Sequence, residues 1–180
     1  MARWGLRGRG EELEQLILAS NLFYQKHGVG RIDKAATPIK VVEVVDGTKI
    51  TEAYFEKKST VDFYGIVQGH FIAFDAKQVA TGSLPLKNIH EHQIAYMAEV
   101  EQQGGVSFLI VEFSELGRYF LLPFEVLADY HARSKRGGRK SIPLEAFPAE
   151  LEIELFRGHR LKYLENLNRY FEWKEEYSSI

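Results

Sequence analysis

The chain has 180 residues, of which 45% are hydrophobic, with no cysteine and a formal net charge of −2 at pH 7. This length allows one hydrophobic core, so we expect a single domain over residues 1–180, and the lack of cysteine excludes disulfides and thiolate ligands. No apolar run is long enough to cross a bilayer and no apolar signal core follows the first arginines, so we expect a cytoplasmic protein with no membrane partner.

The first two predicted elements are a helix and a β-hairpin. Residues 11–27 have apolar side chains at helical spacing, acidic residues in the first turn and Gly28 after the last turn, which is the pattern of an amphipathic helix. Residues 39–55 contain two runs of β-type residues around Asp46-Gly47, a dipeptide typical of tight turns. We therefore expect a hairpin over about 39–55.

The centre of the chain predicts a second hairpin, followed by helices and strands in alternation. The arms of this hairpin, at 62–67 and 70–77, flank Gln68-Gly69, where the chain can turn back. The remaining predicted elements are a loop at 79–88, helices at 89–103, 123–133 and 161–173, and strands at 106–113 and 118–122. This order predicts an α/β or α+β fold, with a mixed sheet flanked by helices.

Basic residues gather in two places although the net charge is slightly negative. The segment before the first helix contains Arg3, Arg7 and Arg9. The second cluster consists of Arg133, Lys135, Arg136, Arg139 and Lys140. A basic face suits phosphate binding. A solvated surface of mixed charge is the alternative, and composition alone favours it because nucleic-acid-binding domains are usually basic overall.

The second hairpin brings acidic and basic side chains together. Asp75 and Lys77 are two residues apart on one strand, so both project from the same face, while Phe74 and Ala76 point to the other. The turn of the hairpin folds the chain back and can bring Asp62 beside Asp75. Two carboxylates and one ammonium group would then share a small area.

Such a group of side chains is typical of phosphodiester cleavage. Carboxylate oxygens bind Mg²⁺, which polarises the phosphate and lowers the pKa of a bound water. The candidate ligands are Asp62 and Asp75, with the Ala76 carbonyl as a third, and Lys77 is the candidate for positioning the attacking water. The alternative is an ion pair on an exposed strand face, which this pattern alone favours because surface charge pairs are common.

Several motifs occur in one characteristic order along nearly the whole chain. Around the hairpins they are Glu52-Ala-Tyr-Phe55, Ser59-Thr60-Val61-Asp62 and Phe74-Asp-Ala-Lys77, with Gly65 and Gly69. Elsewhere they are Arg9-Gly10 with Leu13-Glu14, Pro85-Leu-Lys-Asn-Ile-His90-Glu-His92-Gln93, and Gly138-Arg-Lys-Ser-Ile142. Together these motifs resemble those of RecU-type Holliday junction resolvases, which are PD-(D/E)xK nucleases also labelled penicillin-binding-protein-related factor A.

The resemblance implies an architecture and a function. The fold would be a restriction-endonuclease-like PD-(D/E)xK core, with the hairpin at 39–55 protruding as a stalk into the junction centre. The activity would be Mg²⁺-dependent symmetric nicking of four-way DNA junctions by a homodimer, in recombination and repair, with Mn²⁺ as a substitute ion. The implied protein partners are a RecA-like recombinase and a RuvB-like branch-migration motor.

The resemblance also assigns roles to individual residues. The positions that match the family's catalytic residues are Asp62, Asp75 and Lys77. Glu14 matches a first-helix glutamate that helps to complete the metal site, and Gln93 and Thr60 would support the site. The residues expected to contact DNA are Arg7, Arg9, Lys49, Arg133, Lys135, Arg136, Arg139 and Lys140.

Three features depart from the family pattern. Asp75 stands where the family usually has glutamate, the first hairpin is a few residues shorter, and the long basic N-terminal extension of some members has no counterpart. Two rival functions therefore stay open at this point. One is another PD-(D/E)xK endonuclease that cuts duplex or flap DNA, and the other is a non-catalytic, junction-binding regulator of recombination.

Overall fold

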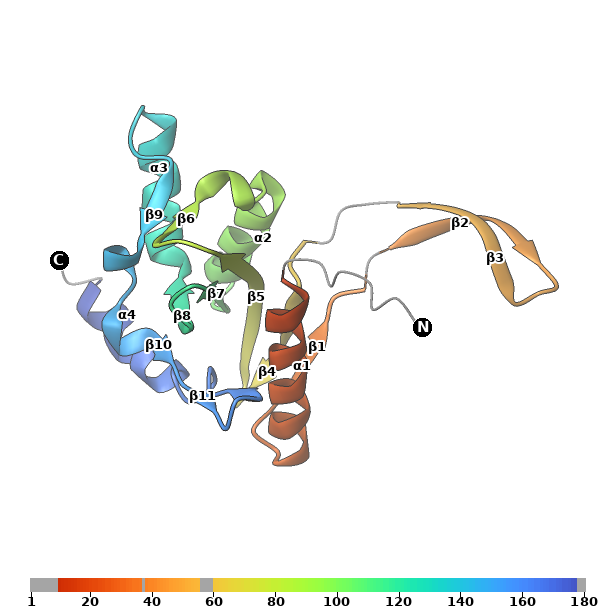
Figure 1. Cartoon of the computed structure of the whole chain (residues 1–180), viewed down its shortest axis with the longest axis horizontal. Helices are drawn as coiled ribbons and strands as arrows, with labels where there is room; N and C mark the ends of the chain where they lie inside the picture. Colours follow the sequence, from red (N-terminus) through yellow and green to blue (C-terminus); the bar gives the residue numbers. More distant parts are fainter. Residues whose placement is uncertain (1–9, 37, 56–59, 178–180) are drawn as a thin grey trace.

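The computed structural model of the protein describes residues 10–36, 38–55 and 60–177, and its centre is a six-stranded sheet (Figure 1). The strands, in their order across the sheet, are β1 (Gly30–Lys34), β4 (Phe63–Val67), β5 (His70–Val79), β7 (Val106–Phe113), β8 (Arg118–Pro123) and β10 (Glu152–Ile153). β5 and β7 run parallel, and the other neighbouring strands pair antiparallel. The predicted mixed sheet is thus confirmed.

Helices cover both faces of the sheet, and each face has its own core. The helices are α1 (Glu11–Lys26), α2 (Glu91–Gln102), α3 (Phe124–Lys135) and α4 (Leu167–Tyr177). On one face, Ile17 of α1 and Tyr170 of α4 belong to the core that contains Phe74 of β5. On the other face, Met97 of α2 and Leu127 of α3 share a core with β7. α2 is also the crossover that connects the parallel strands β5 and β7.

Both predicted hairpins are present, and the backbone angles at their turns account for the glycines and for Asp46 found there. The first joins β2 (Ile39–Val45) to β3 (Lys49–Phe55) through Asp46 and Gly47, whose φ angles are 53° and 69°. The second joins β4 to β5 through Gln68 and Gly69, at 50° and 88°. Glycine adopts such angles without strain, and aspartate tolerates them better than most residues.

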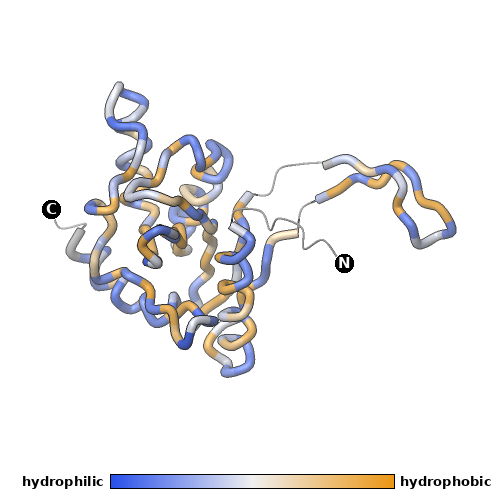
Figure 2. The backbone as a smooth tube through the Cα atoms, viewed as in Figure 1, coloured by the Kyte–Doolittle hydropathy of each residue, from blue (hydrophilic) through white to orange (hydrophobic). Residues whose placement is uncertain are grey.

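The β2–β3 hairpin extends away from the six-stranded sheet (Figure 1). Every β2 side chain is exposed, as are the side chains of residues 49–54. Many of them are apolar, which Figure 2 shows as orange stretches along the hairpin. These exposed apolar side chains are Ile39, Val41, Val42, Val44, Val45, Ile50 and Tyr54. A two-stranded hairpin is only marginally stable alone in water. Apolar side chains exposed together in this way are typical of a contact surface.

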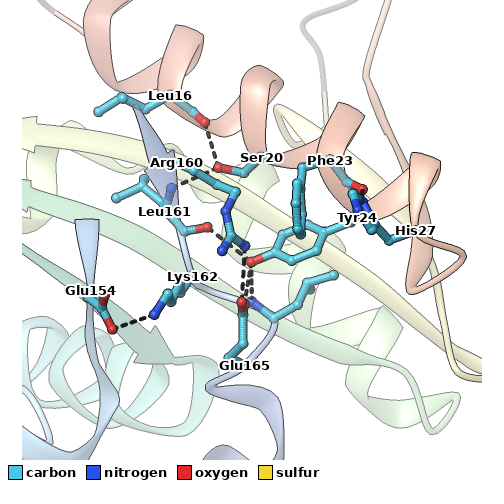
Figure 3. A network of polar contacts seen from close by, with 11 residues as sticks. Leu16, Ser20, Phe23, Tyr24, His27, Glu154, Arg160, Leu161, Lys162 and Glu165 are labelled. Carbon is cyan, nitrogen blue, oxygen red and sulfur yellow. Dashed lines mark hydrogen bonds and ion pairs between the residues drawn. The ribbon is translucent and has the colours of Figure 1, made fainter. Parts of the chain in front are cut away.

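The last helix, α4, begins at Leu167 and not at the predicted residue 161, because side chains of α1 form hydrogen bonds with the backbone of Leu161 (Figure 3). The Leu161 N–H donates to Ser20 Oγ at 2.8 Å, and the Leu161 carbonyl accepts from the Tyr24 hydroxyl at 3.0 Å. β12 (Arg160–Leu161) pairs with β11 (Leu155–Phe156) at this point. The prediction of a helix from 161 was therefore wrong.

A short two-stranded ribbon connects the end of β5 to the basic loop. β6 (Ser83–Pro85) pairs with β9 (Ser141–Pro143), and the Leu86 N–H donates to the Lys140 carbonyl at 3.0 Å. Within the described residues, the 3₁₀ helices are η1 (Leu86–Asn88), η2 (Leu144–Ala146) and η3 (Ala149–Leu151). The ribbon holds the basic loop at 136–140, with Arg136, Arg139 and Lys140, close to the segment that follows β5.

Candidate active site

Asp75 and Lys77 project from the same face of β5, the face that α2 covers. The Lys77 ammonium lies 2.5 Å from Asp75 Oδ2. The Asp75 side chain is fully buried, and Lys77 is 16% exposed. A buried carboxylate requires partners of this kind, because an unpaired buried charge is costly.

Asp62 is brought to Asp75 by the pairing of the second hairpin. Phe63 pairs with Phe74 at the end of this hairpin, so the residues just beyond them, Asp62 and Asp75, lie opposite each other. The Asp62 N–H donates to Asp75 Oδ1 at 2.8 Å, and the Ala76 N–H donates to Asp62 Oδ2 at 3.1 Å. Each carboxylate therefore accepts a backbone hydrogen bond from the partner's strand, and this exchange fixes their separation.

The surroundings of Asp62 disfavour its charge. Burial, and then the negative charge of Asp75, raise the pKa of Asp62 to about 6 from its ordinary value of 3.8. The Ala76 N–H and the Lys77 ammonium act in the opposite direction but do not cancel the rise. Two neighbouring carboxylates whose negative charges repel each other form a site that favours a bound cation.

Gln93 connects the carboxylate pair to the start of α2. Its amide Nε2 donates to Asp75 Oδ2 at 2.5 Å, and its Oε1 accepts from the His90 N–H at 3.0 Å. The side chain is 6% exposed. Because the His90 N–H can only donate, it orients the amide so that the Nε2 group faces Asp75. Gln93, which was expected to support the site, is thus in direct contact with it.

The donor set fits a hard divalent cation. Asp62 and Asp75 offer carboxylate oxygens, the ligands that Mg²⁺ prefers, and the Ala76 carbonyl belongs to the same strand segment. Within the described part of the chain, no group of three or more His, Asp or Glu side chains is placed to hold a metal ion. Two protein carboxylates would therefore leave several coordination positions for water and phosphate, as magnesium sites in nucleotide enzymes commonly do.

The structure does not bring Glu14 into this group, contrary to the expectation from the sequence. Its carboxylate accepts from the Lys34 ammonium at 2.6 Å. The reason is geometric: α1 packs Leu13 and Ile17 on the sheet face opposite to the one that carries Asp75. A role of Glu14 in metal binding stays a prediction. Thr60, also named as site support, is exposed two residues before Asp62.

The residues predicted to bind DNA fall into three groups. Arg7 and Arg9 lie outside the described residues, and Lys49 is exposed at the start of β3. In the second basic cluster, Arg136, Arg139 and Lys140 are exposed in the loop between α3 and β9. The other two residues of the cluster, Arg133 and Lys135, are exposed and form ion pairs within the protein.

Carboxylates of the protein neutralise those two cations. Arg133 pairs with Asp129 at 2.6 Å, and Lys135 with Glu91 at 2.5 Å. The first pair could have been anticipated, because residues four apart meet on a helix. The second joins α3 to the first turn of α2, 44 residues away along the chain, and no local pattern indicates it. Phosphate would compete with these carboxylates for both cations.

Among the helices of the described residues, none is both long and apolar enough to cross a membrane.

Comparison with known proteins gives consistent results for family and length. The family model described as "Recombination protein U" matches residues 8–169. The chain is 41% identical over 163 residues to the Holliday junction resolvase RecU of Pediococcus pentosaceus, covering 88% of this chain and 78% of that protein. It is 40% identical over 175 residues to the Holliday junction resolvase RecU of Lactococcus lactis subsp. lactis, covering 94% and 80%.

Among solved structures, the chain is similar to Hjc of Archaeoglobus fulgidus, a Holliday junction resolvase from an archaeal hyperthermophile. The TM-score is 0.42 and the identity is 10%, with 66% of this chain and 75% of that chain covered.

Proposed function

The chain belongs to the RecU family of recombination proteins, and from this membership we infer that it is an endonuclease that resolves four-way DNA junctions. The observation in the structure that most supports a catalytic protein is the convergence of Asp62, Asp75 and Lys77 at the end of one hairpin. A protein that only bound junctions would not need two opposed carboxylates next to a lysine.

We propose that Asp62 and Asp75 bind a divalent cation, Mg²⁺ with Mn²⁺ as a substitute, and that the Ala76 carbonyl is a third ligand. When bound, the ion would polarise the scissile phosphate and lower the pKa of a coordinated water. The protein's contribution is to hold the two carboxylates at a fixed separation, through the hydrogen bonds from the Asp62 and Ala76 N–H groups.

Lys77 is the proposed residue that orients the attacking water and offsets negative charge on the phosphate in the transition state. One of the three N–H donors of its ammonium is engaged by Asp75 at 2.5 Å, which leaves the others for water or a phosphate oxygen. Gln93 is a proposed positioning residue, because it holds Asp75 Oδ2 from the other side.

The proposed DNA contacts come from the basic loop, the N-terminal arginines and the hairpin. Arg136, Arg139 and Lys140 are exposed beside the ribbon that follows β5, so phosphates held there would lie near the same part of the sheet. The protruding β2–β3 hairpin is the proposed stalk that enters the junction centre. Symmetric nicking requires two active sites, so we propose a homodimer; RecA-like and RuvB-like partners stay predictions.

A cleavage assay distinguishes this function from its rivals. The purified protein is incubated with Mg²⁺ and a labelled four-way junction, beside linear and flapped duplexes of the same sequence. Paired nicks at symmetric positions of the junction are expected. Equal cutting of the linear duplex would instead indicate a duplex endonuclease, and binding without cutting a regulator.

The variant Lys77→Ala tests the catalytic assignment. It should bind the junction as the unchanged protein does but cut it at least about a hundredfold more slowly, since lost transition-state stabilisation of this kind typically costs two to three orders of magnitude. Lys26→Ala, an exposed lysine at the end of α1, is the matched control and should cut normally. Full cleavage by Lys77→Ala would remove Lys77 from the mechanism.

A further inference from the structure

One exposed carboxylate lies between two nitrogen donors on the face of the sheet that carries the candidate site. It belongs to Glu91, the first residue of α2. The Lys135 ammonium donates to it at 2.5 Å, and His131 Nε2 lies 3.2 Å from it, both from α3. A carboxylate only accepts hydrogen bonds, so His131 Nε2 carries the proton. Two donors of one helix thus hold an anion that another helix supplies.

These contacts are not needed to hold α2 and α3 together. The side chains of Glu91 and Lys135 are 68% and 60% exposed, and an ion pair so open to water contributes little to stability. The two helices already share an apolar core through Met97 and Leu127. Hydrogen bonds from Lys135 and then His131 lower the pKa of Glu91 below its ordinary value of 4.5, so the carboxylate is charged at neutral pH.

The basic loop at 136–140 lies on both sides of this carboxylate. Lys135 is the last residue of α3, and the loop follows it directly. The other end of the loop returns to the segment before α2, because the Lys140 carbonyl accepts from the N–H of Leu86, five residues before Glu91. An acidic side chain is therefore held among the cations that are proposed to meet DNA.

The start of α2 adds to the preference of this place for an anion. Glu91 is in the first turn of the helix, where the helix dipole favours negative charge. The same end of a helix favours phosphate. Gln93, two residues farther along α2, donates to Asp75 at 2.5 Å. A phosphate in the position of the Glu91 carboxylate would thus lie beside the turn that positions the metal-binding pair.

We propose that Lys135 and His131 form a binding site for a backbone phosphate of DNA, and that the Glu91 carboxylate occupies this site until DNA displaces it. The inference rests on the proposed function, because the phosphate is that of the DNA substrate. A phosphodiester strand fits better than a small free anion, since Arg136 and Arg139 are exposed on the adjoining loop and would meet further phosphates of the same strand.

Glu91 would then set the strength of DNA binding without selecting a sequence or a DNA shape. Phosphate contacts carry no sequence information, so competition by Glu91 should weaken binding to a junction and to a linear duplex alike. The Glu91–Lys135 pair has no net charge. A phosphate that meets Lys135 without Glu91 should release about one additional counterion, which makes the binding more dependent on salt.

The variant Glu91→Gln tests the inference by a gain of binding. Binding of a labelled four-way junction and of a linear duplex is measured without divalent cation, so that no cleavage intervenes, over a series of salt concentrations. Both dissociation constants should fall about two- to fivefold at low salt, the change that corresponds to an exposed ion pair. The slope of log affinity against log salt should steepen by about one. Unchanged constants would overturn the inference, since a merely stabilising ion pair would give that result.

Glu154→Gln is the matched control for net charge. Glu154 is 61% exposed and accepts from the Lys162 ammonium at 2.8 Å, so this substitution also removes one negative charge and releases one lysine. The residue lies between β10 and β11, away from α2 and α3. Its affinity and salt slope should equal those of the unchanged protein. An equal gain in both variants would mean an effect of net charge alone and would overturn the inference.

A double-mutant cycle identifies the phosphate ligands. The gain from Glu91→Gln should disappear when Lys135→Gln is added, because the site is then lost together with its competitor. Adding His131→Gln instead should remove part of the gain. If Glu91→Gln with Lys135→Gln kept the full gain, Lys135 would not be the ligand and the inference would fail; the same result with His131→Gln would remove His131 from the site.

Two further measurements separate this inference from its neighbours. Isothermal titration of the unchanged protein with inorganic phosphate should show no measurable binding, and tight binding would assign the site to a free anion instead. Junction nicking with Mg²⁺ is measured in parallel. A neutral Glu91→Gln in a protein that binds and nicks junctions would contradict this inference alone. A gain of binding in a protein that does not nick would support the phosphate site and contradict the proposed nuclease function.

Discussion

Asp75 is the most constrained side chain of the candidate site. Its Oδ1 accepts from the Asp62 N–H, while its Oδ2 accepts from both Gln93 and Lys77. A carboxylate oxygen has two lone pairs, so Oδ2 is fully engaged and Oδ1 keeps one for a further partner. The orientation of this carboxylate is therefore set by three segments of the chain: the residue before β4, β5 itself and α2.

Removing one of these three partners should weaken metal binding. In Gln93→Leu, Asp75 loses the donor that holds it toward α2, and we expect metal affinity to fall about 10-fold to 100-fold, the usual effect of losing a hydrogen bond to a metal ligand. Isothermal titration with Mn²⁺ measures this directly, and single-turnover nicking should fall in parallel. Gln103→Leu, at the exposed end of the same helix, should change neither quantity. Normal Mn²⁺ affinity in Gln93→Leu would show that the contact has no positioning role.

At the scale of residues, the sequence predicted contacts within one hairpin better than contacts between side chains of different elements. The alternation of a strand and the position of the turn were enough to place Asp62, Asp75 and Lys77 together. Glu14 was expected beside them from the family resemblance, and the helical periodicity of residues 11–27 could not test this, because it does not determine which face of a sheet the helix will cover. The ion pair of Lys135 with Glu91 was missed for a similar reason, because it depends on how α3 packs beside α2.

At the scale of elements, one lysine of α4 forms ion pairs with both neighbouring helices. The Lys174 ammonium lies 2.6 Å from Glu101 at the end of α2 and 2.7 Å from Glu125 at the start of α3. Burial opposes the charge of Lys174, but the hydrogen bonds and charges of the two glutamates raise its pKa above 10.5. Lys174 is therefore the ion-pair partner of two partly buried glutamates.

Lys174→Met should therefore destabilise the fold. We expect the free energy of unfolding at pH 7 to fall by about 1–2 kcal/mol, less than for a fully buried pair because water reaches this one. A lysine with a raised pKa in the folded state stabilises that state at lower pH and loses the effect as pH rises through the raised value. Urea unfolding should thus show the difference at pH 7 and a smaller one above about pH 10.5. Lys26→Met, at an exposed site, should match the unchanged protein at both values; a Lys174→Met protein of undiminished stability would contradict the account.

The β2–β3 hairpin should contribute to substrate choice rather than to stability. The side chains of residues 39–54 are exposed, so replacing residues 39–55 by a short Gly-Ser linker should remove little buried surface. We expect the melting temperature to change by no more than a few degrees, and the preference for a four-way junction over a linear duplex to be lost. The ratio of initial nicking rates on the two substrates measures this. A variant that kept its junction preference would exclude the stalk role.

The elements themselves were largely predictable, because each depends on signals close by in the sequence. Asp46-Gly47 and Gln68-Gly69 marked the two hairpins, and Gly104-Gly105 followed the end of α2. The exceptions depend on distant partners. α4 starts at Leu167 rather than at 161 because Ser20 and Tyr24 of α1 engage the backbone of Leu161. The pairing of β6 with β9 likewise joins segments too far apart in sequence for any local signal.

At the scale of the whole molecule, the candidate site depends on the packing of α2 against the β4–β5 hairpin. The β4–β5 hairpin supplies the two carboxylates and the lysine, and α2, the crossover to β7, supplies Gln93. The two carboxylates repel each other in the folded state, where their separation is fixed. A cation bound between them should consequently stabilise the entire fold, because the unfolded chain does not keep the carboxylates together.

The most direct test of the central claim is the melting temperature of the protein with and without divalent cation, compared among the unchanged protein, Asp62→Asn and Asp129→Asn. Binding to the folded state alone at ten times the dissociation constant adds about 1.4 kcal/mol, which for a chain of this size raises the melting temperature by about 3–5 °C. We predict this rise with Mg²⁺ or Mn²⁺ for the unchanged protein and for Asp129→Asn, a partly exposed carboxylate on α3 that pairs with Arg133, and its loss in Asp62→Asn. An equal rise in Asp62→Asn would show that the cation does not bind to the Asp62–Asp75 pair.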